Sequence, residues 1–297
     1  MVADTARVRF APSPNGRLHL GHAFSAIYAS QGAASLNGIF MLRIEDIDVG
    51  RCREEFIDGI YEDLEWLGLT WEEPVRRQSE HFDVYEAALK QLRDLNVIYP
   101  CFATRRKIER AITQSSIGAD RWPRDPDGAL IYPGIYKHIR SGDRNDLMWE
   151  GRSYAWRLDV AKAVHLAEEM NSGPITFHEE EAGPHGEKGI QPIQPELFGD
   201  VVIARKDVPT SYHLAVTVDD ALQNITHVTR GRDLYPATYI HRLLQVLLGL
   251  PEPRYRHHRL IEDDKGRRLS KSARDMGLRD LRLAGKSPDD IRVMIGV

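Results

Sequence analysis

The first hundred residues alternate between short β-rich runs and amphipathic helical stretches. Residues 8–11 and 39–44 are apolar and short enough to be buried strands. Apolar side chains recur at helical spacing over residues 17–36, 54–67 and 80–95. A strand, helix, strand, helix order predicts an α/β protein with a parallel sheet and right-handed helical crossovers.

The pattern changes between residues 99 and 195. Proline and glycine become frequent, helical stretches are short, and strand-like runs occur at residues 154–160 and 175–178. We interpret this region as an inserted α+β subdomain. The parallel pattern resumes at residues 201–204, followed by a helix at 212–222, a strand at 225–229 and a helix at 238–248. The expected domains are residues 1–98 and 196–250 as two halves of the sheet domain, 99–195 as the insertion, and 251–297 as a C-terminal segment.

Composition narrows the class of protein. The sequence has no run of about 18 apolar residues, so no membrane span is expected. Residues 1–9 lack the apolar core of a signal peptide, which predicts a cytoplasmic protein. Cys52 and Cys101 are the only cysteines, too few for a disulfide framework or a cysteine zinc site. A net charge of −4 still permits an RNA partner held by local basic patches, and we expect a monomer.

The first motif with chemical content is His19-Leu20-Gly21-His22, which follows the turn signal Asn15-Gly16. A helix that starts there directs unpaired backbone N–H groups and a positive dipole at any ligand above the strand ends. Gly21 permits close approach to the backbone, and both imidazoles can donate to phosphate oxygens. Read alone, the motif is equally compatible with two ordinary helix histidines.

The second motif is the basic run Arg268-Leu269-Ser270-Lys271-Ser272 near the end of the chain. A mobile lysine there can neutralise charge that develops on an α-phosphate. Read alone, Lys271 fits an ordinary surface loop. Together, the two motifs predict an ATP-binding, adenylate-forming site, with His19, His22 and Lys271 as catalytic residues and His19, Gly21, His22 and Lys271 as ATP contacts.

Five ordered blocks carry a family resemblance. They are residues 9–22 (RFAPSPNGRLHLGH), 42–48 (LRIEDID), 212–215 (YHLA), 228–234 (VTRGRDL) and 268–272 (RLSKS). The chain thereby resembles class I aminoacyl-tRNA synthetases of the glutamyl type over nearly its whole length. The resemblance implies a Rossmann-like, doubly wound parallel sheet with ATP at the carboxyl ends of the strands.

The resemblance also implies a reaction. The α-carboxylate of L-glutamate attacks the α-phosphate of ATP, which arrives with Mg²⁺, and the acyl group of the adenylate then passes to an acceptor. Arg9 and Arg230 suit the two carboxylates, because guanidinium binds carboxylate bidentately. Glu45 suits the ammonium. The full glutamate-binding set implied is Arg9, Phe10, Ala11, Pro12, Ser13, Glu45, Tyr212 and Arg230.

The chain departs from the family pattern in two places. Val216 stands where full-length glutamyl synthetases have asparagine, which is typical of a shorter branch, the glutamyl-queuosine tRNA(Asp) synthetases. That branch often carries a zinc knuckle in its insertion. Here the corresponding positions are Cys101, Ala103, Tyr132 and Tyr136, so we expect no metal and apolar packing in its place, with His138 a weak substitute ligand.

Only 25 residues follow Ser272, enough for one or two short helices, so no anticodon-binding domain is expected. The shorter branch transfers glutamate to the queuosine base in the anticodon loop of tRNA(Asp). A loop base presented to a pocket is a common mode of RNA recognition. The anticodon stem-loop of tRNA(Asp) is therefore the expected partner, with phosphate contacts from Arg105, Arg106, Arg256 and Arg259.

Two alternatives stay open. A truncated conventional glutamyl-tRNA synthetase is disfavoured by the chain length and by Val216. A non-catalytic paralogue that binds tRNA or an amino acid is disfavoured because the chain retains the motif residues of an enzyme. Failure to exchange pyrophosphate would favour that third interpretation.

Overall fold

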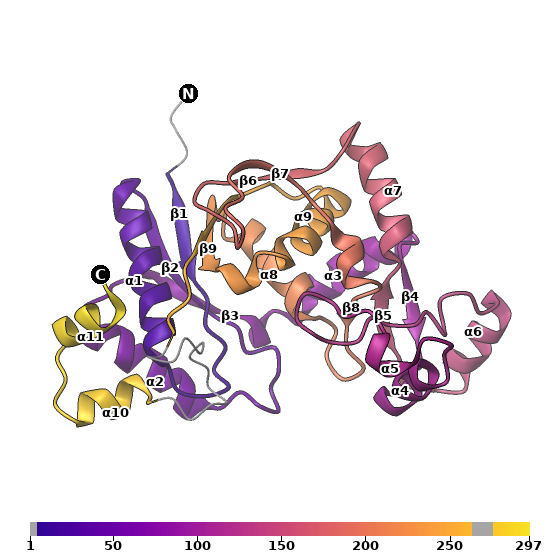
Figure 1. Cartoon of the computed structure of the whole chain (residues 1–297), viewed down its shortest axis with the longest axis horizontal. Coiled ribbons are helices and arrows are strands. Elements are labelled where there is room, and N and C mark those ends of the chain that lie inside the picture. The colour runs from indigo at the N-terminus through magenta and orange to yellow at the C-terminus, as the bar shows by residue number, and fades with distance from the viewer. Residues whose placement is uncertain (1–4, 263–275) are drawn as a thin grey trace.

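A seven-stranded sheet forms the centre of the protein in the computed structural model, which describes residues 5–262 and 276–297 (Figure 1). The strand order is β3-β2-β1-β9-β10-β6-β7, and all neighbours are parallel except β6 and β7. The strands are β1 Arg7–Phe10, β2 Ile39–Ile44, β3 Glu72–Arg77, β6 Thr176–Glu179, β7 Gly189–Pro192, β9 His227–Gly231 and β10 Arg254–His258.

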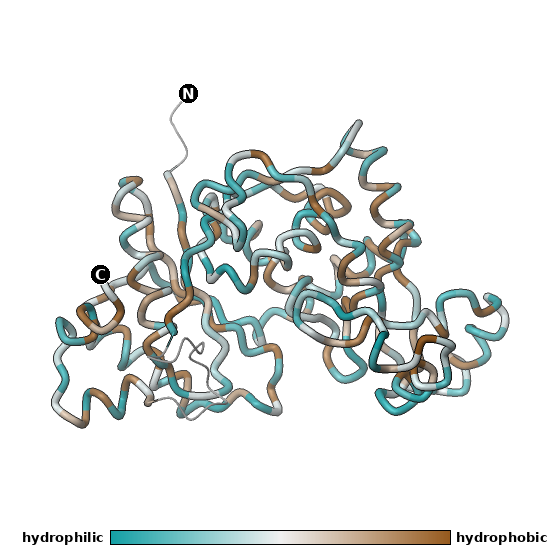
Figure 2. The backbone as a smooth tube through the Cα atoms, in the orientation of Figure 1, coloured by the Kyte–Doolittle hydropathy of each residue, from teal (hydrophilic) through white to brown (hydrophobic). Residues whose placement is uncertain are grey.

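Helices cover both faces of this sheet, as the doubly wound prediction requires (Figure 1). One face packs against α1 (Leu20–Ser35), α2 (Glu54–Trp66), α10 (Leu278–Leu283) and α11 (Pro288–Ile295). The other packs against α3 (Phe82–Asp94), α7 (Val160–Asn171), α8 (Tyr212–Leu222) and α9 (Ala237–Leu248). In Figure 2 hydrophobic residues recur at intervals along these helices, which is the pattern of helices buried by one face.

A second, three-stranded antiparallel sheet contains β4 (Ile98–Cys101), β5 (Ala155–Leu158) and β8 (Val202–Ala204). The short helices α4 (Arg105–Thr113), α5 (Gly118–Arg121) and α6 (Ser141–Trp149) lie beside it (Figure 1). None of the helices in the described ranges is long and apolar enough to cross a membrane. Residues 276–297 form α10 and α11, the short helices expected in this part of the chain. The described residues, 5–262 and 276–297, contain no further helical domain.

Two strands belong to sheets other than those expected. The run at 175–178 was assigned to the insertion, which is wrong, because β6 pairs in parallel with β10 of the main sheet. The run at 201–204 was expected to resume the parallel pattern, which is also wrong, because β8 pairs antiparallel with β5. Strand pairing joins residues far apart in sequence, so local pattern cannot assign a strand to a sheet. The other proposed domain limits, after residues 98 and 250, remain a prediction.

Candidate active site

A cavity of about 560 Å³ opens at the carboxyl ends of the central strands. It lies where β1 meets β9, the point at which the strand order reverses and open α/β sheets bind ligands. Lys271 lies outside the described residues. All the other predicted site residues line the cavity: Arg9, Phe10, Ala11, Pro12, Ser13, His19, Gly21, His22, Glu45, Tyr212 and Arg230.

The N-terminus of α1 faces this cavity and is capped by histidines. His19 is the N-cap residue, and its Nδ1 accepts the backbone N–H of Gly21 at 3.1 Å. Nδ1 of His22 accepts the backbone N–H of His19 at 3.2 Å. Because Nδ1 is the acceptor in both rings, the proton of each neutral imidazole lies on Nε2. Both side chains therefore combine a helix N-terminus with a donor nitrogen suited to a phosphate oxygen.

Gly21 has a steric reason to be glycine. A Cβ at this position would lie 3.0 Å from Cε1 and 3.2 Å from Nδ1 of His19. The His19 ring is the nearest neighbour of such a Cβ, so Gly21 permits the capping geometry that orients that ring. The close approach of a ligand to the Gly21 backbone stays a prediction.

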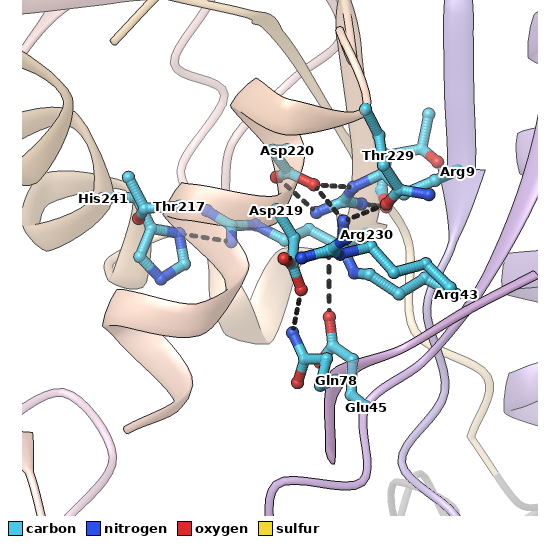
Figure 3. A network of polar contacts seen from close by, with 12 residues as sticks. Arg9, Arg43, Glu45, Gln78, Thr217, Asp219, Asp220, Thr229, Arg230 and His241 are labelled. Carbon is cyan, nitrogen blue, oxygen red and sulfur yellow. Dashed lines mark hydrogen bonds and ion pairs between the residues drawn. The ribbon is translucent and has the colours of Figure 1, made fainter. Parts of the chain in front are cut away.

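A buried ion network crosses the floor of the site (Figure 3). Nε and Nη2 of Arg9 donate to the two oxygens of Asp220 at 2.9 and 3.1 Å. Nη1 of Arg43 donates to Asp220 at 2.8 Å, and its Nη2 donates to Glu45 at 3.0 Å. Burial opposes ionisation of Asp220, but Arg9 and Arg43 outweigh it and hold its pKa below the usual carboxyl value. The charge of Arg9 is thus already paired within the protein.

Glu45 and Tyr212 present polar groups to the same cavity. Burial raises the pKa of the Glu45 carboxyl, against the opposing effect of Arg43 and Arg9. A raised pKa means that the neighbouring cations do not fully compensate the carboxylate for the water it lost on burial. A ligand ammonium beside Glu45 would supply the additional positive charge. Burial likewise raises the pKa of Tyr212, so its phenol stays protonated and able to donate.

Arg230 enters the cavity from β9 with uncharged partners. Its Nε donates to Nε2 of His257 at 3.1 Å, and its Nη1 donates to Nδ1 of His241 at 3.0 Å. Its Nη2 donates to Oγ1 of Thr238 at 2.5 Å. The two arginines predicted to bind carboxylates therefore differ, because Arg9 is neutralised by Asp220 and Arg230 is not.

Comparison with known proteins identifies this combination of sheet and site. Residues 5–286 match the family model described as tRNA synthetases class I (E and Q), catalytic domain. The chain belongs to the class I tRNA synthetases. As a member of that family it is a ligase.

Three similar proteins define its place in the family. The glutamyl-Q tRNA(Asp) synthetase of Rhodobacter capsulatus is 44% identical over 97% of this chain and 99% of its own length. The glutamate–tRNA ligase of Hydrogenobaculum sp. is 35% identical over 95% of this chain and 56% of its own. A solved glutamate tRNA ligase from Elizabethkingia meningosepticum, in complex with its amino acid, has a TM-score of 0.72 and 27% identity over 95% of this chain and 54% of its own. This synthetase chain thus spans about half the length of the two ligases.

Several residues at the synthetase site were missed by sequence reasoning. Thr229, Asp233 and His258 line the cavity, and Asp220 joins the buried network. In the sequence, Asp220 could have been noticed only as a charged residue on the apolar face of a predicted helix. Val216, the departure from the family pattern, is buried on α8 one turn after Tyr212.

The carboxylates of the second motif block, residues 42–48, make specific contacts within this synthetase. Asp46 is buried and accepts the backbone N–H and the hydroxyl of Ser79 at 2.8 and 2.7 Å. Asp48 pairs with Arg51 and Arg205. Asp46 and Asp48 therefore stabilise the loop after β2, and Glu45 alone of the three lines the cavity.

The zinc-knuckle positions of the synthetase pack as a small buried core. Cys101, Ala103, Tyr132 and Tyr136 are all buried in one cluster, which is the apolar packing expected. Sγ of Cys101 donates to Oη of Tyr132 at 3.3 Å, and that oxygen also accepts the backbone N–H of Tyr136 at 2.8 Å. His138 is exposed. Among the described residues no group of three or more His, Cys, Asp or Glu side chains is placed to hold a metal.

Tyr132→Phe is expected to lower the free energy of unfolding by about 1–3 kcal/mol, because the buried N–H of Tyr136 loses its acceptor. Thermal unfolding of wild type and variant, each with and without EDTA, measures this. Tyr154→Phe is the matched control, since Tyr154 packs against the same cluster through its ring. A melting temperature of the wild type that falls on chelation would contradict the prediction that this cluster needs no metal.

The basic run at residues 254–259 of the synthetase is not one exposed patch. Residues 254–258 form β10, an interior strand, in which Tyr255, His257 and His258 are buried, and Arg259 follows it. Nε of Arg256 donates to Glu180 at 2.5 Å, and the guanidinium of Arg259 lies 4.6 Å from the ring centre of Phe24. Arg105 and Arg106, by contrast, are exposed on α4. The two exposed arginines are therefore the better candidates for phosphate contacts.

Proposed function

We propose that this chain activates L-glutamate with ATP and Mg²⁺, without tRNA, and transfers it to the queuosine base in the anticodon loop of tRNA(Asp). In the first step an oxygen of the glutamate α-carboxylate bonds to the α-phosphorus, and pyrophosphate leaves. In the second step a nucleophile of the base bonds to the acyl carbon, and AMP leaves. The proposed ATP contacts are His19, Gly21, His22 and Lys271.

The single observation that carries the proposal is the charge pattern of the cavity. Arg230 presents an unneutralised guanidinium, and Glu45 presents a poorly compensated carboxylate. These are the charges that a dicarboxylic amino acid complements. The Nε2 donors of His19 and His22 lie at the helix N-terminus in the same cavity, where a triphosphate would bind.

The choice of acceptor rests on the relative from Rhodobacter capsulatus, whose name specifies tRNA(Asp) and whose length this chain matches almost completely. A conventional glutamate–tRNA ligase is the second candidate, supported by the 35% identity to the Hydrogenobaculum sp. protein. The two candidates share the activation step and differ only in the acceptor on the RNA.

The test is glutamate-dependent ATP–pyrophosphate exchange with the purified chain, with and without tRNA, followed by transfer of labelled glutamate. Exchange without tRNA is expected. Label should enter tRNA(Asp) that carries queuosine, persist when the terminal adenosine of that tRNA is removed, and be absent from tRNA(Asp) of queuosine-deficient cells. Label on the 3′ end of tRNA(Glu) would instead identify a conventional synthetase. Absence of exchange would leave a binding protein.

A further inference from the structure

The side chains that hold Arg230 are themselves held in place by the surrounding strands and helix. It is 6% exposed and lies opposite His257 in the register of two neighbouring parallel strands, β9 and β10. Thr238 and His241 approach it from α9. Three of the five guanidinium N–H groups, one on each nitrogen, are engaged by these acceptors, which leaves one N–H on each terminal nitrogen for a ligand.

The protonation of both histidines follows from the direction of these bonds. Arginine only donates, so Nε2 of His257 and Nδ1 of His241 must be unprotonated acceptors. Burial and then the charge of Arg230 lower the pKa of His257 to about 4, against the opposing effect of Glu179, and the same two causes lower the pKa of His241 well below its usual value. Nε2–H of His241 then donates to Nδ1 of His213 at 3.2 Å.

Glu179 on β6 determines which nitrogen of His257 carries the proton. One carboxylate oxygen accepts Nδ1–H of His257 at 2.5 Å. The other accepts the backbone N–H groups of His257 and Glu181, both at 3.1 Å. Glu179 and His257 side chains are fully buried, so no water competes for these bonds. The carboxylate therefore keeps Nε2 of His257 as an acceptor directed at Arg230.

The part of the chain that the structure describes contains no ion pair between Arg230 and a carboxylate. Arg9 and Arg43 provide the comparison within the same network, because both donate to Asp220. A buried guanidinium whose hydrogen-bond acceptors are all neutral has no anion to balance its charge, so a bound anion stabilises it. The cavity side of Arg230 is where a ligand can satisfy it.

We infer that Glu179, His257, His241 and Thr238 are positioning residues that hold Arg230 with its charge unneutralised, so that the site selects a ligand carboxylate over a carboxamide. The inference rests on the proposed glutamate site and specifies its selectivity. A carboxylate accepts from both remaining N–H groups. A carboxamide offers one acceptor oxygen and an NH₂ group that meets another donor, and unpaired buried donors strongly disfavour binding.

The first test variant is Thr238→Val, which removes one acceptor of Arg230 and keeps the side-chain shape. We expect KM and Kd for glutamate to rise on the order of tenfold, the loss typical of a hydrogen bond to a charged group. The kcat and the KM for ATP should change by less than about twofold, because among the described residues the lost hydroxyl contacts only Arg230 and His257, which itself holds Arg230. Thr238→Ser keeps the hydroxyl and should therefore keep most of the wild-type affinity for glutamate.

The second test variant is Glu179→Gln. Its amide oxygen would still accept the two backbone N–H groups. Its NH₂ group would donate to Nδ1 of His257, so the ring proton would move to Nε2. That proton would then face the N–H of Arg230, and the hydrogen bond between the two residues would be lost. The same rise in Kd for glutamate is expected. Glu180→Gln is the matched control, at the residue directly after β6, since Glu180 pairs with Arg254 and Arg256.

Calorimetric titration of wild type and variants with L-glutamate and L-glutamine separates this inference from the proposed function. Wild type that binds both amino acids equally would overturn the inference, whatever the exchange assay reports. So would folded Thr238→Val and Glu179→Gln proteins with wild-type Kd and selectivity. Preference for glutamate without pyrophosphate exchange would support the inference and contradict the proposed function. Thermal unfolding confirms folding, and Thr238→Val decides the outcome if Glu179→Gln does not fold.

Discussion

Arg230→Gln is expected to lower kcat/KM for glutamate in pyrophosphate exchange by about a thousandfold, the scale of removing one partner of a buried charge pair. Among the cations that line the cavity in the described ranges, Arg230 is the one whose protein partners are two neutral imidazoles and a hydroxyl, and the variant removes it. The KM for ATP should change little, because His19, Gly21 and His22, three of the proposed ATP contacts, lie at the start of α1. Steady-state exchange at varied glutamate and ATP measures both constants.

Arg254→Gln is the control for this substitution. Arg254 lies on the neighbouring strand β10, is exposed, and pairs with Glu180 away from the cavity. It should retain wild-type constants. An Arg230→Gln protein that folds normally and keeps kcat/KM within about tenfold would show that another cation binds the second carboxylate.

Asp220→Asn is expected to destabilise the fold by about 3–5 kcal/mol, because it breaks a buried charge cluster, leaves Arg9 without its anion and leaves Arg43 with Glu45 alone. Arg9 and Arg43 are 4% and 0% exposed, and Asp220 accepts three of their N–H groups. The expected fall in melting temperature is on the order of 10 °C. Differential scanning calorimetry or dye-monitored unfolding measures it.

The effect should depend on pH in a defined direction. Although burial opposes ionisation, Arg9 and Arg43 hold the pKa of Asp220 below its ordinary value of 3.8. The native carboxylate therefore stabilises the fold at any pH above about 4, and this contribution is lost as the pH falls through the lowered pKa. The difference between wild type and Asp220→Asn should shrink in that acidic range.

Asp207→Asn makes the same chemical change at an exposed site, where the carboxylate lies 3.6 Å from Arg205 with a side chain 70% exposed. It should shift the melting temperature by no more than about one degree. Equal shifts for the two substitutions would contradict a structural role for the buried network.

Strands and helices with a strong apolar pattern were predictable from the sequence. β1, β2, α2 and α8 lie where the periodicity placed them. β3 and β10 were missed, because their sequences EEPVRR and RYRHH read as charged surface. Their polar side chains are satisfied by partners on other elements, such as Glu179 for His257, and no window along one segment contains that information.

The site was predictable only in part. The four motif blocks within the described residues named side chains that line the cavity, since each of these blocks lies at the end of a strand or at the start of a helix. The sequence did not indicate that Arg9 is neutralised while Arg230 is not. That difference depends on Asp220, which lies 211 positions from Arg9, and on His257, which lies 27 positions from Arg230. Long-range contacts of this kind leave no spacing signal.

The position of β1 has a consequence during synthesis on the ribosome. β1 lies between β2 and β9, so one of its edges stays unpaired until His227–Gly231 has been translated. Arg9 emerges early and has no counterion until Asp220 on α8 follows, whereas Arg43 has Glu45 two residues further along, and α1 has no α11 to pack against until residues 288–295 appear. The nascent N-terminal half therefore exposes a strand edge and apolar surface, the features through which unfinished chains aggregate, and residues 288–295 complete a core that begins at β1.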